Sequence, residues 1–207
     1  MPNIQYTFIG PIRQAVTMAN LSFKGALRDE DLDIVREAGI LLKNDKIHQI
    51  GSYWDIFPEA QSIGAEMINL KADFVAMPGI VDCHTHICFA GSRAQDYAMR
   101  NSGKSYLEIA KSGGGIWDSV TQTRKASLEK LAQLTAQRAN RHLKDGITTI
   151  EVKSGYGLSV EEELKMLRAI QLAGESTEAD LIPTCLAAHI RPRDFEGNQR
   201  EYLKKIS

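Results

Sequence analysis

The sequence lacks a long apolar run. Its longest hydrophobic stretches, such as residues 74–80, are far shorter than the roughly 18 to 20 residues that a membrane helix requires. Residues 1–7 have neither the basic flank nor the apolar block of a secretion signal. We therefore expect neither a membrane partner nor a secreted protein.

Cysteine is scarce, and its three positions, Cys83, Cys88 and Cys185, do not have the spacing of a disulfide framework. This predicts a reducing compartment and a cytoplasmic protein. An excess of charge of one sign is also lacking, because 25 Lys and Arg residues are balanced by 26 Asp and Glu residues. The balance gives no reason to expect a nucleic acid as partner.

The remaining composition is that of a folded chain. Of 207 residues, 43% are hydrophobic and 25% are charged, which is average for globular proteins. Strand-like pieces dominate residues 1–72, with a hairpin whose strands, 40–43 and 46–51, flank the turn Asn44-Asp45. The charge-rich residues 29–38 are predicted to form a surface connection. We expect residues 1–72 to be the N-terminal part of a small β domain, similar to a β-sandwich.

Residues 73–207 follow a different pattern, in which strands and helices alternate. The predicted order is strand 74–86, which residues 77–79 (Met-Pro-Gly) break, then helix 127–145, strand 147–152, helix 160–173, strand 181–188 and helix 197–205. Gly146 stands where a helix C-cap belongs, and Ser159 with Glu162 forms a capping box. Such alternation predicts an α/β fold with parallel strands and right-handed crossovers.

The most informative stretch is 78–86, because it places two histidines two residues apart near the end of a strand. Strand side chains alternate between faces, so His84 and His86 project to one side and can meet one metal ion. Imidazole suits zinc, and also iron or nickel. A bare His-x-His pair is nevertheless a weak motif, and the two histidines can simply end the strand. Cys83 should point to the opposite face and pack.

The context of this pair resembles the amidohydrolase superfamily, in which a histidine pair at the end of the first barrel strand holds the catalytic metal. Further motifs are similar to those of the imidazolonepropionases of histidine degradation. They are Phe89-Ala90-Gly91-Ser92-Arg93, residues 105–110, Gly113-Gly114-Gly115-Ile116, Thr121-x-Thr123-Arg124, residues 151–158 and Ala187-Ala188-His189. The resemblance runs from about residue 35 to about residue 193, and its most specific element is 153–158.

The resemblance implies a fold and an activity. The fold is an amidohydrolase-type TIM (β/α)8 barrel, of which residues 73–207 form the first three or so β/α units. The activity is metal-dependent hydrolysis of 4-imidazolone-5-propanoate to N-formimino-L-glutamate in L-histidine catabolism. The resemblance also implies one divalent or trivalent metal ion, with zinc as the first expectation and iron as the second, and a homodimer in the full-length form.

The same resemblance implies roles for five residues. His84 and His86 are the metal ligands, and Arg93, Tyr156 and His189 contact the substrate. Arg93 offers the planar fork that binds a carboxylate, and the glycines beside Tyr156 favour a close-approach loop. Without the resemblance, Arg93 can be a surface arginine, Tyr156 a packed side chain and His189 a third metal ligand or a core histidine. All five lie near C-terminal ends of strands, where barrel active sites form.

Other candidates are expected to be structural. His142 lies within an amphipathic helix, and His48 lies in the hairpin. Lys153 is comparable to the carbamylated lysine of two-metal relatives, but the one-metal pattern leaves it structural or in a supporting position. Residues 113–115 are a weak phosphate cradle, because no strand precedes them and no Lys-Ser/Thr follows.

Residues 73–207 are too few for a full barrel, which takes roughly 250 residues. We therefore hypothesise that the chain is truncated, or that a partner or a second copy completes it. On this hypothesis the chain is inactive on its own. The sequence offers no catalytic residue beyond the two metal ligands. Two alternatives are open. Another amidohydrolase, such as a deaminase or a cyclic-amide hydrolase, would keep His84 and His86 without needing Arg93. A non-catalytic half-barrel would instead bind a partner.

Overall fold

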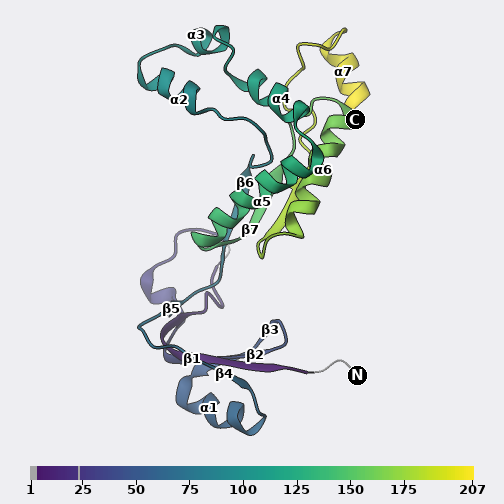
Figure 1. Ribbon diagram of the computed structural model, residues 1–207. Helices are drawn as coiled ribbons and strands as arrows, with labels where there is room; N and C mark the ends of the chain where they lie inside the picture. The colour runs from purple at the N-terminus through teal and green to yellow at the C-terminus, as the bar shows by residue number, and fades with distance from the viewer. Residues whose placement is uncertain (1–3, 23) are drawn as a thin grey trace. The chain divides into compact units, whose positions relative to one another are not determined.

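The computed structural model describes residues 4–22 and 24–207, which divide into two compact units, Met1–Pro78 and Gly79–Ser207 (Figure 1). Residues 1–3, which open the predicted small β domain, and Phe23 lie outside the described residues. Each unit has its own hydrophobic core. In the part of the chain that is described, no helix is long and apolar enough to span a membrane.

The first unit is built on one mixed sheet. Its elements are β1 (Tyr6–Val16), a 3-10 turn (Asp29–Asp31), β2 (Ile34–Lys43), β3 (Lys46–Ser52), α1 (Tyr53–Ser62), β4 (Glu66–Asn69) and β5 (Val75–Ala76). The strand order is β3-β2-β1-β4, with β5 also pairing with β1. Neighbours β1, β2 and β3 are antiparallel, whereas β4 and β5 run parallel to β1. Helix α1 packs Tyr53 and Ile56 against Phe8 and Leu41.

The predicted hairpin is confirmed. Strands β2 and β3 pair from Lys43 and Lys46 onward, and Asn44 adopts a φ of 55°, as such tight turns require. The prediction of a surface connection over 29–38 is wrong for its second half, because residues 34–38 belong to β2. Charged residues there point outward, while Ala38 is fully buried and the backbone pairs with β1. Strand pairing therefore overrides the local charge density.

The second unit contains the parallel sheet. Its elements are β6 (Ile80–Thr85), α2 (Ala94–Asn101), α3 (Tyr106–Lys111), α4 (Ile116–Lys125), α5 (Leu128–Lys144), β7 (Ile147–Lys153), α6 (Val160–Gly174), β8 (Asp180–Thr184) and α7 (Gln199–Ile206). The strand order is β6-β7-β8, and both pairings are parallel. Helices α5 and α6 pack against each other and against this sheet (Figure 1). The alternation of strands and helices predicted for this part of the chain is thus present.

Apolar periodicity explains the core of this unit. Helix α5 contributes Leu131 and Ala139 from one stripe, and β7 contributes the fully buried Ile150 and Val152. Met166 and its neighbours on α6 complete the cluster. Gly146 follows α5 with a φ of 86° and caps it as expected. The core therefore fixes β7 between two helices and its strand neighbours, which in turn fixes where the loops after the strands begin.

One predicted break is confirmed, and one predicted strand is too long. The strand predicted over 74–86 is interrupted at residues 77–79, as expected, and forms β5 and β6. Pro78 lacks a backbone donor, and Gly79 packs so closely on Thr148 that a side chain would overlap it. The strand predicted over 181–188 ends at Thr184. Beyond it, the Leu186 N–H donates to Ser154 Oγ at 3.0 Å instead of continuing the ladder.

The predicted capping box at α6 is half formed. The Ser159 hydroxyl accepts from the Glu162 N–H at 3.3 Å, but the Glu162 carboxylate pairs with Lys165 Nζ at 2.5 Å instead of reaching back. Gly174 is the last residue of the helix and does not follow it. The N-terminus of α6 is consequently set by Ser159.

Candidate active site

Two imidazoles stand together at the end of β6. The ring centroids of His84 and His86 are 5.5 Å apart. His84 is exposed, whereas His86 is half-buried, and its Nδ1 is buried without a hydrogen-bond partner among the residues described. Burial and the neighbouring charges of His189, His84 and Lys153 lower the pKa of His86. Its neutral form, which is the form that binds metals, is therefore favoured.

Tyr156 and His189 come from the loops that follow β7 and β8. The centroid of the Tyr156 ring lies 5.9 Å from that of His86 and 5.9 Å from that of His189. His86 and His189 stack at 5.1 Å with 25° between their planes. The C-terminal ends of three neighbouring parallel strands thus bring four rings together, as the carboxyl face of an α/β barrel does.

The tautomer of His189 follows from its neighbour. Nδ1 of His189 lies 3.3 Å from the carbonyl oxygen of Gly155. A carbonyl only accepts, so this contact favours a proton on Nδ1 and leaves Nε2 as an acceptor. Burial raises the pKa of the Tyr156 phenol, while the positive charge of Arg93 opposes that shift. The phenol is therefore a hydrogen-bond donor at neutral pH.

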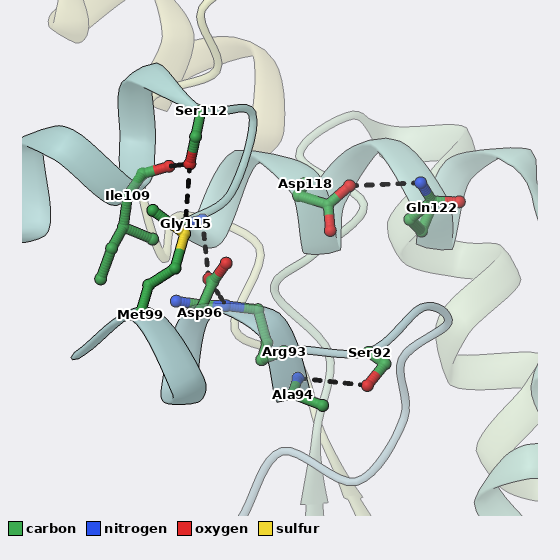
Figure 2. Close-up of polar contacts among 10 residues, drawn as sticks. All are labelled: Ser92, Arg93, Ala94, Asp96, Met99, Ile109, Ser112, Gly115, Asp118 and Gln122. Atoms are coloured by element: carbon green, nitrogen blue, oxygen red, sulfur yellow. Dashed lines mark hydrogen bonds and ion pairs between the residues drawn. The ribbon is translucent and has the colours of Figure 1, made fainter. Parts of the chain in front are cut away.

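Arg93 lies on the segment between β6 and α2 and is bound to Asp96 (Figure 2). The Arg93 Nε donates to the Asp96 carboxylate, which also accepts from the Gly115 N–H at 2.9 Å. The hydrogen bond from Gly115 is the main cause that lowers the pKa of Asp96, outweighing partial burial, and Arg93 lowers it further. Asp96 therefore stays ionised and orients Arg93, whose side chain is 42% exposed.

A cavity of about 430 Å³ lies beside Arg93. It is lined by Arg93, Asp96, Tyr97, Arg100, Lys104, Tyr106 and Ile109. Three cationic side chains and one paired carboxylate give this cavity a positive lining. Such a lining suits an anionic group.

A metal would find two imidazole donors here. Within the described residues, no group of three or more His, Cys, Asp and Glu side chains is arranged to hold a metal ion, so His189 does not join His84 and His86 in such a group. The buried Nδ1 of His86, which has no partner in residues 4–22 and 24–207, and the proximity of His84 fit two positions of a metal shell.

Several other expectations can be compared with the structure. Cys83 is exposed, so the expectation that it packs is wrong; the face of β6 opposite the histidines is uncovered there. Lys153 pairs with Glu151 at 2.5 Å, which fits a structural role. His142 Nδ1 lies 3.8 Å from Asp82, and His48 packs edge-on near Tyr6 at 6.0 Å.

Sequence reasoning missed the carboxylates that hold these loops. Asp96 stands three residues after Arg93, a spacing at which opposite charges meet on a helix, and that was the available signal. Residues 113–115 have a role other than a phosphate cradle: Gly115 binds Asp96, and a side chain at Gly114 would overlap the same carboxylate. Glu163, which binds the loop carrying Tyr156, gave no local signal.

Comparison with known proteins adds evidence of a different kind. No protein-family model matches the chain. The chain is 41% identical over 187 residues to the imidazolonepropionase of Myxococcus xanthus, covering 89% of this chain and 44% of that protein. It is 44% identical over 176 residues to the imidazolonepropionase of Kosmotoga olearia, covering 85% and 41%. This chain is a relative of the imidazolonepropionases. It spans less than half the length of these curated relatives.

Solved structures agree at the level of the fold. Guanine deaminase of E. coli superposes with a TM-score of 0.55 at 12% identity, over 86% of this chain and 35% of the deaminase. A metal-dependent hydrolase from Pyrococcus furiosus gives 0.53 at 12% identity, over 87% and 50%. The zinc complex of atrazine chlorohydrolase from Arthrobacter aurescens gives 0.54 at 14%, over 86% and 35%. The expected fold is confirmed: a partial TIM barrel of the amidohydrolase type with an N-terminal sheet.

Proposed function

We propose that this chain carries the metal-binding and substrate-binding residues of an imidazolonepropionase, which hydrolyses 4-imidazolone-5-propanoate to N-formimino-L-glutamate. The observation that carries the proposal is the convergence of His84, His86, Tyr156 and His189 at three strand ends, in a chain about 40% identical to imidazolonepropionases. Each of these side chains has a defined task in such a reaction.

His84 and His86 would hold one divalent metal, with zinc ahead of iron as the expected ion. When bound, such a metal polarises a carbonyl and lowers the pKa of water, which supplies the nucleophile for hydrolysis. The neutral imidazole of His86 is ready to bind without first losing a proton. The burial of its Nδ1 without a partner in the part of the chain that the structure describes supports a role for this ring beyond packing.

Arg93 would bind the propanoate carboxylate. Its guanidinium is oriented through Nε by Asp96, which leaves the two terminal nitrogens as a fork for a bidentate partner. The Tyr156 hydroxyl would donate a hydrogen bond to a polar atom of the substrate ring. His189 would accept a hydrogen bond from the substrate on Nε2. Binding the substrate by its tail and its ring fixes the scissile bond in place.

Two further parts of the proposal concern the protein in the cell. We expect a cytoplasmic protein, supported by three unpaired cysteines, and a homodimer in the full-length form, by resemblance alone. Sedimentation velocity on the full-length form tests the second expectation.

Metal binding and turnover test the proposed function. The purified chain should bind zinc in equilibrium dialysis, and His84→Ala should abolish that binding while His48→Ala, a histidine of the other unit, leaves it intact. Turnover should be measured for the chain and for a chimera in which it replaces the matching residues of the Myxococcus xanthus relative. Arg93→Ala should raise KM about tenfold or more in the active form, with Arg141→Ala as the control. A chain without bound metal and a chimera without turnover would refute the proposal.

A further inference from the structure

A buried carboxylate from α6 closes the loop that carries Tyr156. Glu163 is 2% exposed. Its Oε2 accepts from the Gly155 N–H at 2.9 Å, and its Oε1 accepts from the Leu158 N–H at 2.6 Å. Helical side chains lean toward the N-terminus of their helix, so a residue near the start of α6 can reach the preceding loop. One carboxylate thus satisfies two buried donors of the same loop.

The loop lies directly against the first turn of α6. A Cβ added to Gly157 would come within 2.5 Å of the Glu163 backbone nitrogen and 2.6 Å of the Glu162 carbonyl carbon. Leu158 has a φ of 58°, a left-handed conformation that bulky residues rarely adopt. Such a conformation persists where surrounding contacts impose it. The hydrogen bond from Leu158 to Glu163 is one of those contacts.

Three further polar groups of the loop also make contacts. Arg124 Nε donates to the Gly157 carbonyl at 2.6 Å, and the Gly155 carbonyl contacts His189. Ser154 is fully buried and accepts the Leu186 N–H on its hydroxyl. These bonds connect the loop after β7 to the loop after β8. The loop backbone is therefore held from the side of α6, while the Tyr156 ring faces His86 and His189.

We propose that Glu163 is a positioning residue of the candidate active site. Its carboxylate fixes the backbone of residues 155–158 and thereby sets where Tyr156 and His189 stand relative to His86. This positioning follows from the contacts of the loop alone. Its effect on ligand binding rests on the proposed function, so the two are measured separately.

Amide hydrogen exchange and ring-to-ring nuclear Overhauser effects test the positioning. In Glu163→Gln, the amide can offer only one acceptor oxygen, so exchange at Gly155 or Leu158 should rise on the order of tenfold or more. The contacts between Tyr156 and His86 should weaken. Glu163→Asp keeps the charge but shortens the reach, and should give an intermediate change. Glu161→Gln removes the same charge from an exposed position on the same helix and should behave as the unmodified chain.

Unchanged exchange and unchanged ring contacts in a folded Glu163→Gln variant would overturn the proposal. If that variant does not fold, the unmodified chain still decides the matter: exchange of Gly155 and Leu158 at the rates of an unstructured peptide would overturn it as well.

Ligand binding separates this inference from the proposed function. The zinc-loaded chain is titrated with imidazole-4-propanoate, and Glu163→Gln should weaken binding on the order of tenfold while Glu161→Gln does not. If the unmodified chain binds neither zinc nor this ligand, the proposed function fails. The exchange and ring-contact measurements then still decide the role of Glu163.

Discussion

Two loops of the candidate site are each held by one carboxylate, but in different surroundings. Asp96 is half-buried and holds the exposed Arg93 to Gly115, whereas Glu163 is buried and holds the loop of Tyr156. Asp96 connects the long side chain of an arginine to a glycine turn, whereas Glu163 binds the backbone of the Tyr156 loop directly. A carboxylate that water reaches can therefore exchange its partners for water, whereas a carboxylate from which water is excluded holds its partners rigidly.

The largest expected difference between the two loops is the loss of folding stability when each carboxylate is removed. Glu163→Ala leaves two buried N–H groups unpaired, at about 1–3 kcal/mol each, so we expect the free energy of unfolding to fall by about 2–6 kcal/mol. Asp96→Ala should cost about 1 kcal/mol or less, because water can replace the lost acceptor. Urea unfolding followed by circular dichroism measures both. Equal losses in the two variants would remove the distinction between the loops.

The substitution Gly157→Ala tests how tightly the loop held by Glu163 packs against α6. Gly157→Ala places a methyl group against the backbone of α6, so the loop or the helix must shift, at about 1–3 kcal/mol. Gly174→Ala is the matched control, because a Cβ added there would meet nothing within 4 Å and the residue ends the same helix. That control should be neutral or stabilising by up to about 1 kcal/mol. A Gly157→Ala variant as stable as the Gly174→Ala variant would show that the loop is not tightly packed.

The smallest effect concerns pH at the loop held by Asp96. The pKa of Asp96 lies below its ordinary value of 3.8, chiefly because of the Gly115 hydrogen bond. A lowered pKa stabilises the folded state fully above that ordinary value, and this contribution is lost as the pH falls through the folded-state pKa. The Gly115 amide signal should therefore stay constant down to about pH 4 and shift below it. Asp96→Asn should remove that shift, and a signal that titrates unchanged in this variant would contradict the assignment.

Local patterns predicted a large part of this structure. The apolar stripe that contains Leu131 and Ala139 predicted α5, and the β-branched residues of 147–152 predicted β7. Strand alternation predicted that His84 and His86 lie on one face. These signals are local, because spacing along one element decides which face a side chain occupies. The roles of the five candidate residues remain predictions.

Tertiary contacts decided what the sequence could not predict. Asp96 and Gly115 meet across 19 residues, and the reach of Glu163 to Gly155 depends on how the loop folds back onto α6. The end of β8 at Thr184 follows from the bond between Leu186 and Ser154, which lie 32 residues apart. The sequence around either partner does not show how the chain folds back to bring the two partners of such a bond together.

The three cysteines differ in exposure and can serve as sites for chemical labelling. Cys83 and Cys185 are exposed, while burial raises the pKa of the Cys88 thiol to about 11 and leaves it unreactive. A thiol reagent should therefore modify two sites of the folded chain and reach the third only on unfolding. Cys83 precedes His84 in β6, so a label there would place a spectroscopic reporter on the same strand as the histidine pair, on its opposite face, without any engineered residue.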